Sequence, residues 1–287
     1  MENNYINRLK INMFEQGYST SYIDRCCSYA TSLISQNLPV IFDKKHLNQI
    51  LMLDTLKLDC YHEFEIYTKG KSRMILAPSK PLKLRQRWIL DEILNKLPTN
   101  QCCHGFVQQR SIKTNAEMHV NKTQVLCMDI HNFFPSININ QVFEVFHCVG
   151  YTSDVAQALA QLCTHNAILP QGAPTSPTLA NIIFSPIDQQ ILNAISTKEI
   201  TYTRYADDLI FSSSHELDFL IPLVSEIIST NGFEINSNKT HLMKNPYRKM
   251  ITGLIVTDTV KIPKYYKRKF NQELFYCEKY GVASHLK

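Results

Sequence analysis

The sequence predicts an α+β fold in which helices pack around a small sheet. Apolar residues recur at helical spacing in several stretches of the chain. Short runs rich in β-branched and aromatic residues, which are typical of strands, lie elsewhere, at residues 124–128 and 200–213 among others. Helices and strands that occur in runs, without strict alternation, are typical of the α+β class.

The first part of the chain, to about residue 60, is predicted to be helical. Its helices are separated by Gly17-Tyr18-Ser19 and by Asn37-Leu38-Pro39. A two-stranded segment is expected next, over Glu63–Tyr67 and Arg73–Ala77, joined by the turn signal Lys69-Gly70-Lys71. A helical N-terminal segment should therefore lead into a β-hairpin.

The next predicted elements are a helix and a strand. The stretch Leu82–Leu97 is amphipathic and is stopped by Pro98. The short apolar run Gln124–Met128 reads as a strand. This strand delivers a carboxylate, Asp129, at its end.

Three further helices are expected from apolar stripes. They cover residues 139–146, 179–191 and 217–228. The second helix should be bent or broken at Pro186, and the third should end at Asn231-Gly232. These stripes indicate core positions and carry no functional inference.

The end of the chain is predicted to form a hairpin and a helix. The hairpin would join Met250–Val256 to Thr259–Ile262. The stretch Lys264–Tyr280 reads as a terminal helix rich in basic residues.

The composition is that of a globular protein with an uneven charge distribution. With 44% hydrophobic residues, 19% charged residues and 8 Gly, the 287-residue chain is neither disordered nor fibrous. Seven basic residues and no acid lie within 66–90, and nine basic residues with a single acid, Asp258, lie within 239–269. Two such blocks indicate surfaces that attract a polyanion.

The nine cysteines lack CxxC spacing, and their number is odd. This pattern favours reduced thiols in the cytoplasm over a zinc site or a disulfide framework. The N-terminus does not resemble a signal peptide, and no apolar run approaches membrane-spanning length. We therefore expect a cytoplasmic protein without a membrane partner.

Asp207 and Asp208 are adjacent where two predicted strands reverse, between Ile200–Tyr202 and Leu209–Ser213. The repulsion between neighbouring carboxylates is most simply offset by a divalent cation, and oxygen ligands favour Mg²⁺ or Mn²⁺. The alternative is a solvated hairpin turn, since Asp is a common turn residue.

Asp129, at the end of another strand, is the expected partner of this pair. Three carboxylates from neighbouring strands could hold two Mg²⁺ ions about 4 Å apart, the spacing used for in-line phosphoryl transfer. One ion would activate an attacking hydroxyl, and the other would hold a triphosphate and stabilise the leaving pyrophosphate. The alternative for Asp129 is a helix N-cap or a turn residue.

A series of short motifs runs from about Arg73 to Ile262. In order, they are Arg73-Met74-Ile75 with Pro78, His104-Gly105-Phe106 with Arg110-Ser111-Ile112, Asp129 to Ile137, Leu169 to Pro177, Tyr205-Ala206-Asp207-Asp208, and Gly232 to Asn236 with Lys239-Thr240. The ordered set resembles the reverse transcriptases, whose YxDD motif matches residues 205–208. Two further stretches point to the reverse transcriptases of bacterial retrons: residues 115–119 match the retron NAxxH element, and Ile251-Thr252-Gly253 matches VTG except for its first residue.

The resemblance implies a right-hand polymerase fold with fingers, palm and short thumb, an antiparallel palm sheet and N-terminal helices. It divides the chain into a helical segment at 1–60, fingers at 61–125, a palm at 126–248, and a palm–thumb hairpin with an abbreviated thumb at 249–287. Only 24 residues follow Pro263, fewer than a thumb of several helices usually needs. Either the thumb is abbreviated or the chain is incomplete.

The resemblance also assigns roles to individual residues. Asp129, Asp207 and Asp208 would be the catalytic metal ligands. Arg73 would contact the incoming triphosphate, because a guanidinium suits phosphate oxygens, although it could be one more basic surface residue. Gln171 would line the nucleotide pocket, although its loop is also unremarkable as a turn-rich segment.

Two more residues are expected to act on the nucleotide. Phe134 would block a ribose 2′-hydroxyl and so select deoxynucleotides; the alternative is a core aromatic beside Phe133. Lys239 would protonate or neutralise the leaving pyrophosphate; the alternative is a solvated lysine.

The remaining candidate residues concern RNA. Asn115 and His119, spaced i and i+4, should share a helix face and have a structural or RNA-contacting role. The basic residues of the terminal helix, interleaved with aromatic ones, should bind a structured loop of the RNA through phosphate contacts and stacking. These basic residues are Lys264, Lys267, Arg268 and Lys269.

The resemblance implies an RNA-directed DNA polymerase that uses deoxynucleoside triphosphates. It would start from a 2′-hydroxyl in its own non-coding RNA, stay bound to the branched RNA–DNA product, and act with an effector protein in anti-phage defence. The alternatives are a reverse transcriptase of a mobile intron or diversity-generating element, and a nucleic-acid-binding scaffold that restrains an effector with catalysis incidental.

Overall fold

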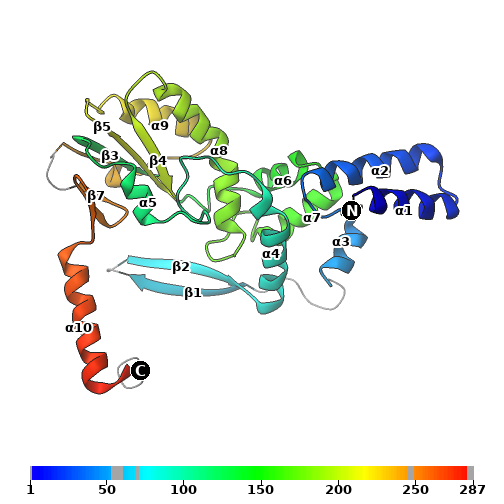
Figure 1. Ribbon diagram of the computed structural model, residues 1–287, viewed down its shortest axis with the longest axis horizontal. Coiled ribbons are helices and arrows are strands. Elements are labelled where there is room, and N and C mark those ends of the chain that lie inside the picture. Colours follow the sequence, from blue (N-terminus) through cyan, green and yellow to red (C-terminus); the bar gives the residue numbers. More distant parts are fainter. Residues whose placement is uncertain (1, 53–60, 69–70, 245–248, 283–287) are drawn as a thin grey trace. The chain divides into compact units, whose positions relative to one another are not determined.

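The computed structural model describes residues 2–52, 61–68, 71–244 and 249–282. The chain divides into two compact units, whose helices and strands are labelled in Figure 1. The first unit comprises residues 1–100 and 132–186, and the second comprises residues 101–131 and 187–287. The four-part division into N-terminal helices, fingers, palm and thumb stays a prediction.

The first unit begins with three helices, α1 (Glu2–Glu15), α2 (Thr20–Ser35) and α3 (Lys44–Ile50). Helices α1 and α2 pack together. Gly17 and Asn37 take positive φ angles of 78° and 58°, which end the preceding helices. The predicted helices and both of the breaks between them are confirmed as far as residue 52, and residues 53–60 lie outside the described residues.

A β-hairpin follows the N-terminal helices. Strands β1 (Tyr61–Thr68) and β2 (Lys71–Pro78) are antiparallel, with Tyr61 opposite Pro78 and Thr68 opposite Lys71. The pairing confirms the predicted hairpin; of its turn signal, Lys69 and Gly70 lie outside the described residues.

The rest of the first unit is helical. Helix α4 (Lys80–Glu92) ends earlier than predicted, and a 3₁₀ turn (Leu94–Lys96) carries the chain to Leu97, which is extended as the position before a proline favours. Helix α6 (Ile139–Cys148) packs on α7 (Ser153–Cys163). The sequence analysis predicted α6 but not α7.

Helix α8 (Ser176–Ile195) runs continuously through Pro186, so of the two expected outcomes the break is wrong, and the bend stays a prediction. Proline removes one main-chain donor from a helix. The other hydrogen bonds of a 20-residue helix remain available. The boundary between the two units nevertheless falls at Pro186.

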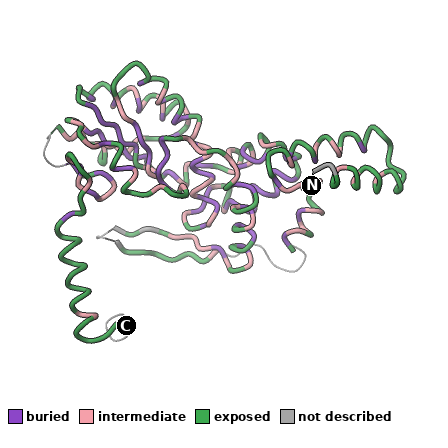
Figure 2. The backbone as a smooth tube through the Cα atoms, in the orientation of Figure 1, coloured by how far each residue is buried: buried purple, intermediate pink, exposed green. Residues whose placement is uncertain are grey.

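The second unit contains a four-stranded antiparallel sheet. Its strands, in spatial order, are β4 (Thr201–Tyr205), β5 (Asp208–Ser213), β3 (Gln124–Asp129) and β6 (His241–Met243). The central strands β3 and β5 are buried almost throughout, as their apolar sequences require (Figure 2). Antiparallel sheets with helices around them confirm the predicted α+β class.

A second, three-stranded sheet replaces the predicted final hairpin. Strands β7 (Lys249–Ile251), β8 (Leu254–Val256) and β9 (Val260–Lys261) are antiparallel neighbours. Thr252 and Gly253 both take positive φ angles, 44° and 83°, and so form a tight two-residue turn inside the stretch that was expected to be one strand. The short helix α5 (Ile112–Glu117) packs on this sheet.

Two more helices belong to the second unit. Helix α9 (Leu220–Thr230) ends at Asn231-Gly232 as predicted, and a 3₁₀ turn (Ser237–Lys239) precedes β6. Helix α10 (Lys264–Tyr280) confirms the predicted terminal helix and contains no buried residue (Figure 2). Within the described residues, no helix is long and apolar enough to cross a membrane.

Candidate active site

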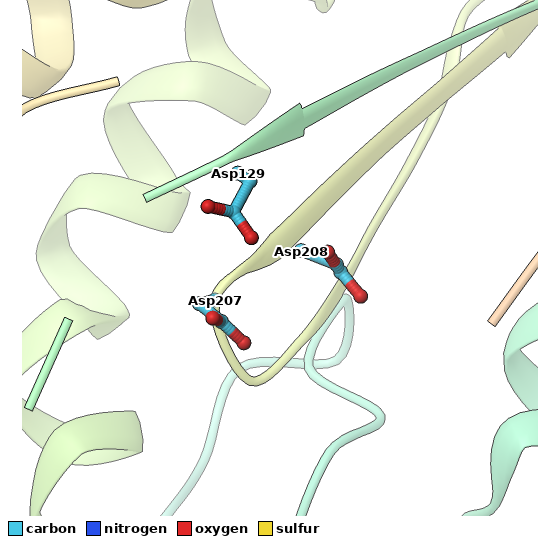
Figure 3. A group of neighbouring side chains, drawn as sticks. All are labelled: Asp129, Asp207 and Asp208. Atoms are coloured by element: carbon cyan, nitrogen blue, oxygen red, sulfur yellow. The ribbon is translucent and has the colours of Figure 1, made fainter. Parts of the chain in front are cut away.

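Three carboxylates meet at one end of the four-stranded sheet. Asp129 ends β3 and lies directly opposite Asp208, the first residue of β5. Asp207 lies in the two-residue turn that joins β4 to β5 (Figure 3). One carboxylate oxygen from each of the three residues lies within 4.8 Å of the other two.

Main-chain hydrogen bonds fix the segments that carry these carboxylates. The amide of Ile130, just past β3, donates to the carbonyl of Asp207 at 2.9 Å. The amide of Asn236 donates to the carbonyl of Asp129 at 2.8 Å. The strand end and the turn are therefore held together by backbone contacts that do not depend on the carboxylates.

The group carries concentrated negative charge. Asp129 is buried, and its Oδ2 forms an ion pair with Nζ of Lys239 at 2.6 Å. Burial, with the nearby carboxylates of Asp207 and Asp129, raises the pKa of Asp208 to about 6. Repulsion of this kind is relieved when a cation binds.

The residues fit a divalent metal centre. All three offer carboxylate oxygens, the ligands that Mg²⁺ and Mn²⁺ prefer. The contact of Lys239 with Asp129 shows that the cluster already attracts a positive charge. Lys239 is therefore part of the carboxylate group rather than simply solvated.

Three of the predicted nucleotide-binding residues, Arg73, Phe134 and Gln171, lie in the first unit. Arg73 is on β2 opposite Ile66, and its side chain is outside the described part of the structure. The carbonyl of Gln171 accepts from the amide of Leu76 on β2 at 2.9 Å, so β2 and the loop after residue 169 are joined.

Phe134 is half-buried, with its ring 5.6 Å from that of Phe133. Phe133 itself is buried against Phe184. The core role thus belongs to Phe133, while Phe134 keeps an accessible side.

Asn115 and His119 do not share a helix face, because α5 ends at Glu117 and His119 lies in the following turn. Both side chains are fully buried, so the structure favours the structural of the two expected roles over RNA contact. The ring of His119 is hydrogen-bonded to the hydroxyls of Thr203 and Ser212, each at 2.7 Å.

Four predicted RNA-binding residues lie on one exposed element. They are Lys264, Lys267, Arg268 and Lys269, all on α10. Exposed aromatic side chains of the same helix, including Tyr265 and Phe270, lie among them.

A buried ion pair beside the turn was missed by the sequence analysis. Arg204, on β4, pairs with Asp188 on α8 at 2.8 Å, and neither side chain is accessible. The signal was present in the sequence: a single arginine in an otherwise uncharged strand, and a single acid in a long apolar helix. Burial of the two could not be inferred from either element alone.

Comparison with known proteins gives one consistent family. The family model described as "Reverse transcriptase (RNA-dependent DNA polymerase)" matches residues 57–263. The chain is 34% identical to the Retron Ec86 reverse transcriptase of Escherichia coli over 83% of this chain and 78% of that protein. It is 30% identical to the Retron Se72 reverse transcriptase of Salmonella heidelberg over 88% of this chain and 69% of that protein.

A third relative, the Retron Mx65 reverse transcriptase of Myxococcus xanthus, is 34% identical over 68% of this chain and half of its own length. The matched residues include the whole carboxylate group and the strands that carry it. The chain therefore belongs to the reverse transcriptases of bacterial retrons, which are RNA-directed DNA polymerases.

Proposed function

We propose that this polymerase copies its cognate structured non-coding RNA into branched single-stranded DNA, starting from a 2′-hydroxyl within that RNA. The observation that carries the proposal is the group of Asp129, Asp207 and Asp208 in a chain whose relatives are retron reverse transcriptases. Acidic side chains this close together are suited to the divalent ions that assist phosphoryl transfer.

The three carboxylates would hold two Mg²⁺ ions, with Mn²⁺ as a possible substitute. Bound ions would supply Lewis-acid stabilisation of the reacting phosphate and lower the pKa of the attacking hydroxyl. Lys239, now paired with Asp129, would neutralise charge on the leaving pyrophosphate. A Lys239→Ala enzyme with an unaltered chemical step in single-turnover kinetics would dispose of this role.

The first unit would bind the deoxynucleoside triphosphate. Arg73 would contact its phosphates, and Gln171, tied to β2, would line its pocket. Phe134 would exclude the ribose 2′-hydroxyl with its accessible side. We expect Phe134→Ala to raise ribonucleotide incorporation relative to deoxynucleotide incorporation; an unchanged ratio in single-nucleotide extension assays would reject the gate.

The decisive experiment is expression of the protein with its neighbouring non-coding RNA. We expect RNase-resistant DNA that carries a short branched RNA stub. A matched Asp207→Asn/Asp208→Asn variant should bind the RNA and yield no DNA. DNA primed from a 3′ end, without a branch, would instead favour a mobile-intron or diversity-generating type of enzyme.

We also propose that the complex works in the bacterial cytoplasm with an effector protein in anti-phage defence. Family membership supports this proposal. Phage challenge of cells with the wild type and the Asp207→Asn/Asp208→Asn variant tests it. Protection by the catalytically dead variant would favour the scaffold role, in which RNA binding alone restrains the effector.

A further inference from the structure

Three buried side chains lie beside the turn that carries Asp207. They form a group that we call the arginine cluster: Asp188 on α8, with Tyr202 and Arg204 on β4. Arg204 Nη2 and Nε donate to Asp188 Oδ2 and Oδ1 at 2.8 and 3.0 Å, and the Tyr202 hydroxyl donates to Oδ1 at 2.8 Å. Arg204 and Asp188 are completely inaccessible to solvent.

Fold stability alone explains this cluster poorly. Moving a guanidinium and a carboxylate out of water carries a desolvation cost that their attraction repays only when the geometry is good. Replacement of such pairs by apolar side chains is often neutral or stabilising. A second use of the arginine would account for its retention in a buried strand.

Arg204 has such a second contact, and that contact is on the turn. Its Nη1 donates to the carbonyl of Ala206 at 3.2 Å. This carbonyl belongs to the peptide group that joins Ala206 to Asp207. The arginine therefore connects helix α8 to the peptide group that precedes Asp207, and so fixes the orientation of that peptide.

Ala206 needs such support because its backbone is strained. Its φ angle is 57°, in the left-handed region that costs a residue with a Cβ atom about 1 kcal/mol or more. Turns of this kind usually hold glycine, asparagine or aspartate there. Strained conformations persist when the surroundings over-determine them.

A glycine restrains the turn from another side. A Cβ atom on Gly105 would overlap the amide nitrogen of Ala206, so only glycine permits this approach. The same segment is anchored to β4, because the amide of His104 donates to the Arg204 carbonyl at 2.7 Å and the Arg204 amide donates to the Cys102 carbonyl at 2.8 Å. Arg204 thus contributes both its backbone and its side chain to holding the turn.

We propose that Arg204 and Asp188 are positioning residues, which set the turn so that Asp207 and Asp208 bind divalent cations in the geometry needed for catalysis. This inference rests on the proposed metal-dependent function. Supporting groups around metal ligands typically change metal affinity or activity by about 10- to 100-fold when they are removed.

The first test is Arg204→Lys. A lysine can keep the charge opposite Asp188, but its single nitrogen lacks the planar fork that reaches Asp188 and the Ala206 carbonyl together. In primer extension on an RNA template, we expect the Mg²⁺ concentration for half-maximal rate to rise about 10-fold or more. The affinity for the primer–template should stay unchanged.

The second test separates positioning from folding. The triple variant Asp188→Leu/Tyr202→Phe/Arg204→Met replaces the whole arginine cluster by apolar side chains of comparable size and leaves no buried hydroxyl without its acceptor, which should preserve the melting temperature within a few degrees. It nevertheless lacks the donor to Ala206, so we expect the same rise in the Mg²⁺ concentration for half-maximal rate and a lower kcat.

Tyr202→Phe is the matched control. It removes one hydrogen bond from the arginine cluster and leaves the contact to Ala206 in place. We expect a lower melting temperature with the wild-type Mg²⁺ dependence. If the cluster served folding alone, all the variants would need the same Mg²⁺ concentration for half-maximal rate as the wild type when they are compared at equal folded fraction.

The experiments distinguish a failure of the proposed metal-dependent function from a failure of the positioning role. If wild-type synthesis needs no divalent ion, or survives Asp207→Asn, the proposed metal site fails. If the wild type depends on Mg²⁺ and the folded Arg204 variants keep its Mg²⁺ dependence and kcat, the positioning role is wrong. Failure of both Arg204 variants to fold would assign the cluster to stability and equally overturn the inference.

Discussion

Asp208 begins a strand opposite Asp129, so two carboxylates are held side by side by sheet register rather than by attraction. The pKa of Asp208 is raised to about 6 by its burial and by these neighbours. As the pH rises from about 4 to 6, an unfolded chain releases this proton before the native protein does. The metal-free native state therefore loses stability over that interval, and the cost persists at higher pH.

The first prediction concerns this cost. Asp208→Asn removes a negative charge that is held beside two other carboxylates, so the metal-free variant should be more stable than the wild type at pH 8. Because Asp208 is partly open to solvent, screening limits the gain to about 1 kcal/mol, or about 2–4 °C in melting temperature. The difference should vanish near pH 4.

Thermal melting in EDTA with and without excess Mg²⁺ measures this effect. Mg²⁺ should stabilise the wild type more than Asp208→Asn, and only the wild type should make DNA. Equal melting temperatures for the two proteins at pH 8 in EDTA would contradict the electrostatic account.

His119 predicts a second pH effect, of opposite sign. Burial lowers the pKa of its ring to about 3, so it stays neutral in the native protein, while an unfolded chain takes up a proton below about pH 6.5. Stability should therefore fall as the pH drops, by about 2 kcal/mol at pH 5 from this residue alone. Denaturant unfolding of the wild type and His119→Gln at pH 7.5 and 5 measures it; an equal fall in both proteins would exclude His119 as the cause.

At the scale of elements, the sequence analysis succeeded where one local signal sufficed. The apolar run before Asp129 and the β-rich flanks of Asp207-Asp208 predicted strands, and the strands lie side by side with their acids at one end. The predictions were wrong where contacts between distant parts of the chain determine the local structure. Thr252-Gly253 forms a turn within a predicted strand, and α8 continues through Pro186 without a break.

Polar residues in apolar elements were the other failure. Arg204 and Asp188 are sixteen positions apart and are each anomalous alone; only their contact explains them. His119 likewise has its hydrogen-bond partners on β4 and β5, more than eighty residues further along the chain. Periodicity locates buried positions but cannot pair the polar groups that occupy them.

The third prediction concerns the loop that carries Gln171. A Cβ atom at Gly172, whose φ angle is 136°, would press against the carbonyl of Leu76 on β2. Gly172→Ala should therefore push this loop from β2 and raise the KM for deoxynucleotides more than it lowers the affinity for primer–template. Gly232→Ala is the control, because Gly232 also has a positive φ, 81°, but open space around it.

Steady-state kinetics with one varied deoxynucleotide distinguishes the two variants. Gly232→Ala should lose stability through backbone strain alone and keep its KM. A KM unchanged in Gly172→Ala would separate the loop from nucleotide binding and remove the support for Gln171.

At the scale of the whole molecule, charge is distributed in a way that suits a polyanion. The net charge is only +5, but the second basic block culminates in α10, where every described side chain is at least partly exposed. A helix of 17 residues without a buried face gains little from packing on its own chain. Basic and aromatic side chains on such a helix are suited to phosphate contacts and to stacking on unpaired bases.

The last prediction tests α10 through salt dependence. Replacing Lys267, Arg268 and Lys269 by glutamine keeps good helix formers and removes three charges. If all three contact phosphates, the slope of log K against log salt for the cognate RNA should become shallower by about 2–3. The control is a triple variant with the same loss of net charge on other helices. It replaces Lys10 on α1 and Lys44 and Lys45 on α3 by glutamine. Equal slopes for the two triple variants would mean that overall charge governs binding and that α10 makes no specific contact with the RNA.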